Sequence, residues 1–202
     1  IYLKSSNKYY KTITTNEKGF TSTTLPYGVW IFKQVTTTSG YEKVDDFEVI
    51  IDNNSNDDIT KIISNAEITA KLKVIKIDNE SNKVLMKDGI KFRIKNLDTG
   101  EYVCQKVTYP NQEKVCIFET KGGVFVTPHV LGTGNYQIEE LEEQKIDGYI
   151  WNKEPLKFII NENSEFIEDK DFGLMLVVKF TNKQVKGEVE LNKIGEKLVI
   201  EN

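Results

Sequence analysis

Hydrophobic and polar residues alternate along most of the chain, and no segment keeps the spacing of an amphipathic helix. Runs rich in β-branched and aromatic residues recur, and clusters of Gly, Asn and Asp interrupt them. The pattern predicts strands over residues 72–77, 90–96, 101–108, 114–119, 124–126, 135–141, 156–160 and 175–181. Many short strands at such spacing are typical of antiparallel β-sandwiches, so we expect an all-β fold.

One passage of the sequence occurs twice. Residues 63–77 are matched by residues 180–194. In each copy an Asn ends one β-like run, and a Lys stands eleven residues later in the next run. Both the asparagines and the lysines are separated by 117 residues. A fixed period of this length indicates tandem domains.

The repeat divides the chain into three parts. We expect a complete β-sandwich over residues 69–185, an incomplete one that lacks its first strand over 1–68, and the first strand of a following repeat over 186–202. The pattern of residues 25–34 parallels that of residues 132–140, which supports this division. The chain is therefore interpreted as a portion of a longer array of repeats.

Three of the expected strands carry a polar residue at the end of an apolar face. Alternation places Lys76 with Leu72 and Val74, Glu140 with Tyr136 and Ile138, and Asn182 with Val178 and Phe180. A buried Lys, Glu or Asn destabilises a fold unless it is paired. We expect these three polar groups to satisfy one another if their strands are neighbours.

Two interpretations of this trio stay open. The first is a buried ion pair between Lys76 and Glu140, with Asn182 hydrogen-bonded nearby. The second is a reaction, because burial lowers the pKa of a lysine and raises that of a glutamate. A neutral amine is a nucleophile, and a protonated carboxylic acid can polarise an amide carbonyl. Attack of Lys76 on the side-chain amide of Asn182 would release ammonia and leave an isopeptide bond, with fixed proximity supplying much of the rate.

The residues around the trio resemble a known family, the B-type domains of the Cna collagen adhesin, which includes the SpaA-like backbone-pilin repeats of Gram-positive bacteria. The similar signatures are Lys73–Asp78, Gly134–Glu140, Asp147–Tyr149 and Val178–Lys183. The resemblance covers residues 72–183 fully and 1–66 in part. It implies an inverse immunoglobulin-like sandwich of the prealbumin-like type. It also implies an autocatalytic bond between first and last strands, with Lys76 as the amine, Asn182 as the acceptor and Glu140 as the catalytic acid.

The resemblance implies a mechanical role rather than an enzyme that acts on an outside substrate. Repeats of this kind would form the stiff stalk of an extracellular, cell-wall-anchored adhesin or pilin. The expected partners are neighbouring repeats of the same chain, and the self-directed reaction would need no cofactor.

The other two parts depart from the family pattern. In the first part Gln34 holds the position of Glu140, and a Gln cannot exchange a proton in the same way. Its Lys is absent, although Asn65 remains as a possible acceptor, and the third part offers only Lys193. A strand that bears Lys193 could pair with the open first part of another molecule by strand donation.

The only two cysteines, Cys104 and Cys116, lie almost symmetrically about a turn signal at Tyr109-Pro110-Asn111. They could face each other across two antiparallel strands, and a disulfide needs their Cα atoms within about 7 Å. Two free thiols are the alternative, and both remain open. The cysteines are not part of the core pattern of the family.

Composition excludes several classes of function. The net charge is −4 with acidic and basic residues interspersed, so nucleic acid is not an expected partner. No apolar run is long enough to span a membrane. His129 is the sole histidine, which excludes a multi-histidine metal site, and we expect no metal. The acidic stretch 52–58 is interpreted as a solvated turn rather than a calcium loop, because it lacks a bidentate acid at the right spacing.

Two other functions were weighed against the stalk. Glu139, Glu140, Glu142 and Glu143 supply the paired carboxylates of a glycosidase, but neighbouring strand residues point to opposite faces. A β-sandwich adhesin module that binds a glycan or a host matrix protein is the second alternative. Its candidate aromatic residues are Trp30, Tyr41, Tyr149 and Trp151, of which Trp30 is expected in the core.

Overall fold

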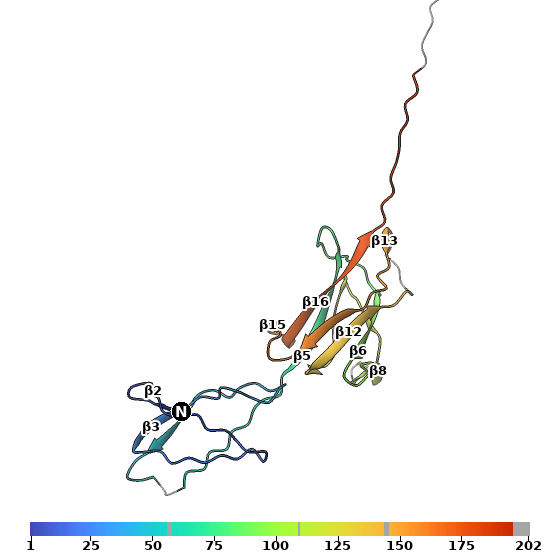
Figure 1. The fold of residues 1–202 in the computed structure, drawn as a ribbon. Coiled ribbons are helices and arrows are strands. Elements are labelled where there is room, and N and C mark those ends of the chain that lie inside the picture. Colours follow the sequence, from blue (N-terminus) through green and yellow to red (C-terminus); the bar gives the residue numbers. More distant parts are fainter. Residues whose placement is uncertain (56–57, 109, 144–145, 196–202) are drawn as a thin grey trace, which may run out of the picture.

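The computed structural model describes residues 1–55, 58–108, 110–143 and 146–195. Two bodies of strands follow each other along the chain, and residues 186–195 extend away from the second body without forming a strand (Figure 1). We use the names unit 1 for residues 1–68 and unit 2 for residues 69–185. No helix among the described residues is long and apolar enough to cross a membrane.

Unit 2 contains a sheet in the strand order β10-β5-β16-β13, with β11 paired to β5 and β15 paired to β16. Its strands are β5 (Thr69–Asp78), β10 (Val124–Val126), β11 (Leu131–Gly132), β13 (Tyr149–Ile150), β15 (Phe166–Asp169) and β16 (Gly173–Gln184). The first and last strands, β5 and β16, are parallel neighbours, with Phe180 opposite Lys76. All other pairings are antiparallel, as expected for the sandwich, so this central pair is the one departure among the described strands.

The second sheet of unit 2 has the order β14-β12-β6-β9, and a separate hairpin joins β7 to β8. The strands are β6 (Lys91–Asn96), β7 (Gln105–Val107), β8 (Glu113–Val115), β9 (Phe118–Glu119), β12 (Gly134–Glu140) and β14 (Leu156–Ile160). The core lies between the two sheets, and Phe92 of β6 meets Phe180 of β16 edge-to-face at 5.2 Å between ring centroids. Burial of each such side chain stabilises the fold by roughly 1.5–3 kcal/mol. The expected all-β sandwich is therefore confirmed.

Two of the expected strands are shorter than predicted. Only β7 is formed within the expected strand 101–108, and the expected strand 114–119 is split into β8 and β9 at residues 116–117. The split follows from the topology, because β9 pairs with β6 in the second sheet whereas β8 pairs only with β7. Tyr109 of the expected turn lies outside the described residues.

Unit 1 forms a single four-stranded sheet in the order β2-β1-β3-β4. Its strands are β1 (Tyr2–Leu3), β2 (Lys8–Tyr9), β3 (Gly28–Phe32) and β4 (Phe47–Ile51). Within the described part of residues 1–67, the buried hydrophobic side chains are Ile1 and Trp30. Ile62, near the end of unit 1, is largely exposed. The unit therefore has one sheet and a small core, where unit 2 has two sheets.

Local hydrogen bonds show the relation between the two units. After β4, Ser55 Oγ donates to Ile50 O at 3.2 Å, and after β14, Ser164 Oγ donates to Ile159 O at 2.9 Å. The same serines accept from the backbone N–H of Asp52 and of Asn161, respectively. The described part of the acidic stretch 52–58 thus forms the turn that its counterpart forms in unit 2, while Asn56 and Asp57 lie outside the described residues.

Candidate functional site

The candidate site lies where three strands of unit 2 converge. Lys76 is on β5 and Asn182 is on the parallel neighbour β16, while Glu140 ends β12 in the facing sheet. Their side chains point inward because each occupies the buried phase of its alternating strand. The structure thus brings the three predicted site residues together across the interior of the sandwich.

The lysine amine contacts both of the other groups. Lys76 Nζ donates to Glu140 Oε2 at 2.6 Å and to Asn182 Oδ1 at 2.5 Å. The amide nitrogen of Asn182 donates to the second carboxylate oxygen, Glu140 Oε1, at 3.4 Å. The carboxylate therefore bridges the amine of Lys76 and the amide nitrogen of Asn182. The sequence had suggested that it would polarise the amide carbonyl, but in the structure it is the lysine that contacts this oxygen.

Water has almost no access to the trio. The Lys76 side chain is fully buried, and Glu140 and Asn182 are only 4% and 2% exposed. Aromatic rings cover the amine, with Lys76 Nζ at 4.4 Å from the ring centroid of Phe180 and 5.7 Å from that of Phe92. Burial lowers the pKa of Lys76 from 10.5 to about 8, although its charge interaction and hydrogen bond with Glu140 act in the opposite direction. Near neutral pH a minor fraction of the amine is therefore uncharged.

This arrangement allows a chemical step as well as an ion pair. A neutral amine in contact with an amide group is a nucleophile held beside its electrophile. A carboxylate that touches both the attacking and the departing nitrogen can move a proton from one to the other. Both interpretations weighed from the sequence are thus compatible with the contacts.

Two contacts beside the trio had no signal in the sequence. Trp151 Nε1 donates to the backbone oxygen of Glu140 at 3.1 Å, and Asn152 Nδ2 donates to Thr181 O at 3.0 Å. These bonds tie the segment after β13 to the ends of β12 and β16, on either side of the site. The sequence singled out Trp151 only as a candidate ligand-binding residue, and nothing in the pattern placed Trp151 or Asn152 beside the trio.

Unit 1 brings Gln34 and Asn65 together in a related way. Asn65 Nδ2 donates to Gln34 Oε1 at 2.7 Å and to Glu42 O at 2.6 Å. Gln34 Oε1 also accepts from the backbone N–H of Val44 at 2.9 Å. The polar contacts of both side chains are therefore with neutral groups. Lys193 lies in the extended segment 186–195 and is exposed.

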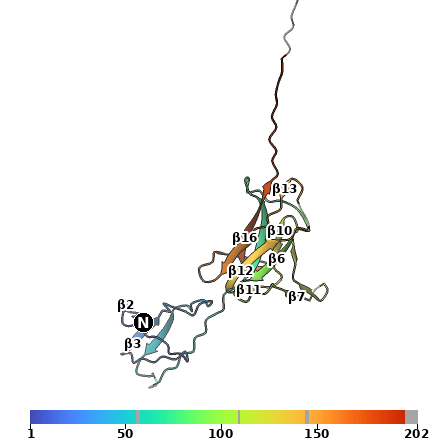
Figure 2. The same cartoon turned by 45° about the vertical axis from the view of Figure 1, so that its right-hand side comes forward.

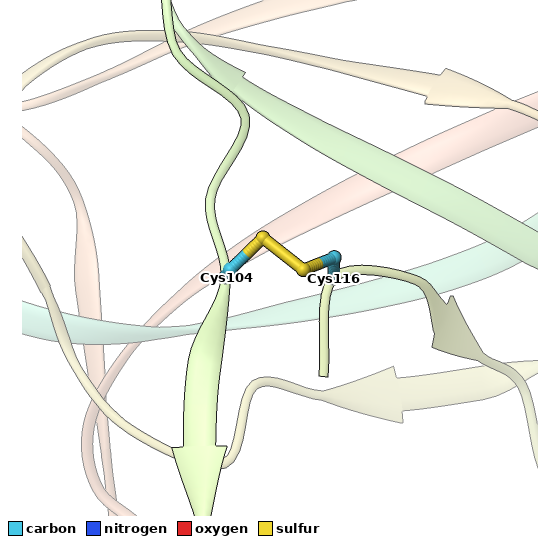
Figure 3. The surroundings of a disulfide bond; sticks show 2 residues. All are labelled: Cys104 and Cys116. Carbon is cyan, nitrogen blue, oxygen red and sulfur yellow. A yellow bond between two sulfur atoms is a disulfide. The ribbon is translucent and has the colours of Figure 1, made fainter. Parts of the chain in front are cut away.

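A disulfide joins Cys104 to Cys116, with 4.2 Å between the Cα atoms (Figure 3). It closes the open end of the β7–β8 hairpin, because the two cysteines flank the paired residues of these strands. His129 lies against the same hairpin, since its backbone N–H donates to Gln105 Oε1 and its Nε2 contacts Lys106 O. The bond braces a projecting hairpin and is separate from the trio.

The carboxylates of the glycosidase alternative face different surroundings. Glu139 pairs with Arg93 at 3.2 Å on the outside of its sheet, while Glu140 points inward to Lys76. Glu143 pairs with Lys91. Over the described residues, no group of three or more His, Cys, Asp or Glu side chains is placed to hold a metal ion.

The aromatic residues of the ligand-binding alternative are also dispersed. Trp30 is buried, as expected, and Tyr41 is exposed in unit 1. Trp151 lines a shallow hollow of about 190 Å³ with Ile150, Asn152, Thr181 and Lys183. Small-molecule sites usually occupy clefts of about 300–1,000 Å³, so this hollow gives the alternative little support.

Comparison with known proteins identifies the fold family. Residues 70–171 match the family described as SpaA, prealbumin-like fold domain. The chain belongs to this SpaA family. The match starts within β5 and covers both sheets of unit 2 up to the residues before β16. No curated protein matches the chain.

Several solved structures are similar to this chain. The Bacillus anthracis TIE protein is 21% identical with a TM-score of 0.55, and the aligned region covers 88% of this chain and 29% of that one. The pilus 2b backbone protein of group B streptococcus is 21% identical, with coverage of 69% and 49% and a TM-score of 0.44. The shaft pilin SpaA of Lactobacillus rhamnosus GG is 19% identical, with coverage of 92% and 85% and a TM-score of 0.39. The likeness to the TIE protein carries the fold argument, and the chain spans less than a third of its length.

Proposed function

We propose that the chain is a portion of the stalk of a Gram-positive surface adhesin or pilin, in which an isopeptide bond between Lys76 and Asn182 locks unit 2. The observation that carries the proposal is the fully buried amine of Lys76, held against both Asn182 Oδ1 and Glu140 Oε2. The same contacts suit a buried ion pair, and the proposal adds that they hold the amine beside the amide it would attack. Membership of the SpaA family supports the stalk role.

The reaction balances without an external reagent. Glu140 takes a proton from the Lys76 ammonium, and the resulting neutral amine attacks Cγ of Asn182. Glu140 returns this proton to Nδ2 and the Cγ–Nδ2 bond breaks. The second proton lost by Nζ passes through the Glu140 carboxylate to the released ammonia, which leaves as ammonium. The product is a secondary amide between the two side chains. The contact of Glu140 with both nitrogens supports this proton path.

Burial supports the chemistry in two ways. It lowers the pKa of Lys76 to about 8, so the nucleophilic form is accessible near neutral pH. It also keeps water from competing with the amine for the amide carbon. The reaction occurs once in each molecule and acts on the protein itself, so the chain is not an enzyme in the ordinary sense.

The proposed location is extracellular, in a protein anchored to the cell wall, with neighbouring repeats as partners. Unit 1 is proposed to be an incomplete repeat that lacks the bond, because Gln34 cannot transfer a proton and the contacts of Asn65 are with Gln34 and Glu42. The segment 186–202 is proposed to begin the next repeat.

The intact mass of the purified chain tests the proposal. We expect a deficit of one ammonia molecule, in addition to the two hydrogens removed by the disulfide. Lys76→Ala and Glu140→Ala should each restore the missing ammonia. Glu140→Gln is the more specific variant, because it keeps the size of the side chain while removing its acidic group. It also places in unit 2 the same residue type that unit 1 has at the corresponding position, Gln34. An intact wild-type mass without the deficit would refute the bond, and a deficit that survives in Glu140→Gln would refute the assigned acid.

A further inference from the structure

The end of unit 2 reproduces the backbone contacts made at the end of unit 1. Ile68 N donates to Gly40 O at 2.9 Å, and Val185 N donates to Gly148 O at 2.8 Å. Both glycines adopt a left-handed conformation, with φ of 88° at Gly40 and 79° at Gly148. The chain therefore leaves each unit through the same hydrogen-bonded loop.

The two loops differ in what covers them. A Cβ atom at residue 40 would lie 2.7 Å from Thr133 Oγ1 of unit 2, whereas a Cβ at residue 148 would meet nothing within 4 Å. Ile68 is 3% exposed within the core of unit 2, whereas Val185 is 62% exposed. One copy of the loop is covered by a neighbouring unit, and the other is bare.

We propose that the Gly148 loop and the side chain of Val185 form the docking surface for a following repeat of the same kind. In the following repeat, the loop that corresponds to the Thr133 loop would pack on Gly148. The side chain of Val185 would be buried in the core of that repeat, as Ile68 is buried in the core of unit 2. The inference builds on the proposed stalk function, but it does not depend on the isopeptide bond.

The segment beyond Val185 identifies the occupant. Its outward hydrophobic residues Val189 and Leu191 are 80% and 90% exposed, and at a separation of 117 residues they correspond to the buried Leu72 and Val74 of β5. If this segment formed a strand like β5, these residues would give it an apolar face, which is stable only when a sandwich forms around it. The partner is therefore a unit that grows from this strand, rather than an unrelated protein.

The joint also sets how one unit is oriented on the next. The backbone of Ile68 is bonded to unit 1, while its side chain is packed in unit 2. No flexible linker separates the two units, because β5 begins at the next residue, Thr69. Figure 2 shows the chain running from β4 through a stretch without named strands into β5 of unit 2. A stalk built from this joint would hold successive repeats in one repeated orientation.

Amide hydrogen exchange on two chains tests the proposal. In the 202-residue chain, Ile68 N–H should exchange slower than Val185 N–H by on the order of tenfold or more, because both amides make the same bond but only one is covered. In an extended chain, residues 1–185 are followed by a second copy of residues 69–185. In that chain, the N–H of the first copy of Val185, which the added unit would cover, should exchange as slowly as the N–H of Ile68. Unchanged exchange at Val185 in the extended chain would overturn the proposal.

Alanine variants provide a matched control. Gly40→Ala and Gly148→Ala place the same Cβ at the same left-handed conformation, so both introduce the same backbone strain. In the 202-residue chain, the new methyl group of Gly40→Ala also collides with Thr133, whereas that of Gly148→Ala contacts nothing. Gly40→Ala should therefore speed exchange at Ile68 N–H more than Gly148→Ala speeds exchange at Val185 N–H. Thr133→Ala should remove this excess. In the extended chain the two glycine variants should become equivalent, and equal effects already in the 202-residue chain would count against the proposal.

The same samples separate this proposal from the proposed bond. Lys76→Ala should remove the ammonia deficit, whereas Ile68 N–H should still exchange more slowly than Val185 N–H. A wild-type chain with no deficit but with the expected exchange pattern would refute the bond and keep the joint. A chain that shows the ammonia deficit but not the expected exchange pattern would support the bond and refute the joint.

Discussion

The substitution Asn182→Ala separates a covalent brace from an ordinary buried ion pair. It removes the acceptor of the proposed bond but leaves Lys76 and Glu140 paired at 2.6 Å. If the bond exists in the wild-type protein, the variant loses a closed loop with a sequence separation of 106 residues. If it does not, the variant loses only the hydrogen bonds of one amide.

The two cases differ in magnitude. By analogy with disulfides, closing a loop of this length stabilises the folded state by roughly 4–5 kcal/mol at 25 °C. A lost hydrogen bond costs about 0.5–1.5 kcal/mol, or about 1.5–3 kcal/mol when the partner is charged, as Lys76 is. We therefore expect Asn182→Ala to lower the free energy of unfolding of unit 2 by roughly 4–5 kcal/mol if the bond exists, and by at most about 3 kcal/mol if it does not. A loss of about 4–5 kcal/mol lies at the upper end of what single substitutions cause, so the result is diagnostic.

Urea denaturation followed by tryptophan fluorescence measures this difference. In a Trp30→Phe background the remaining tryptophan is Trp151, which is bonded to Glu140 O beside the site. The slope of the free energy against urea should also rise in the variant, because an unbraced chain exposes more surface when it unfolds. Asn65→Ala is the matched control in unit 1, where the asparagine donates two hydrogen bonds without a lysine partner. A loss below about 3 kcal/mol for Asn182→Ala would mean that the amide contributes only hydrogen bonds.

Three further predictions concern charge and the disulfide. In Asn182→Ala the amine of Lys76 stays free, with a pKa of about 8 in the folded state against 10.5 in the unfolded state. Between these two pKa values the unfolded chain binds more protons than the folded one, so the free energy of unfolding should rise from pH 8 to 10.5. Urea titrations at several pH values measure this rise, and adding Lys76→Met should abolish it. Hydrogen bonds from Ser81 and Glu80 lower the pKa of Asp78 from 3.8 to about 2. The stability that the ionised carboxylate contributes above pH 3.8 should therefore be lost as the pH falls toward 2. In Asp78→Asn this part of the pH dependence should be absent. Reduction of Cys104–Cys116, whose sequence separation is 12, should destabilise unit 2 by up to roughly 3 kcal/mol and leave the ammonia deficit in the intact mass unchanged.

The inward residues of the long strands could be predicted from alternation alone. Leu72, Val74 and Lys76 are fully buried, and Glu140 and Asn182 are buried at the ends of their faces. Alternation works here because successive side chains of a strand must point to opposite sides of the sheet. The polar residues at these positions were therefore recognisable as buried before any fold was known.

Which strands lie side by side could not be read from periodicity. The parallel pairing of β5 with β16 joins residues that are about a hundred positions apart, and the sequence pointed to it only through resemblance to a family. The strands β11 and β13 were missed because two residues are too few to show alternation. The strand β15 was missed because it is short, has no buried residue and places two apolar residues before two acidic ones, without alternation. The orientation of the Asn182 amide toward Glu140 depends on side-chain packing, which no local pattern encodes.

The parallel pairing gives the proposed bond a mechanical consequence. Because β5 and β16 run in the same direction, the chain enters unit 2 at one end of the sandwich and leaves it at the other (Figure 1). In the proposed stalk, tension would shear the two central strands past each other, against their hydrogen bonds and packing. With Lys76 joined to Asn182, the load passes from the start of β5 across the side-chain bond to the end of β16. The residues between these two positions, including the hairpin with its disulfide, then lie outside the path of the force.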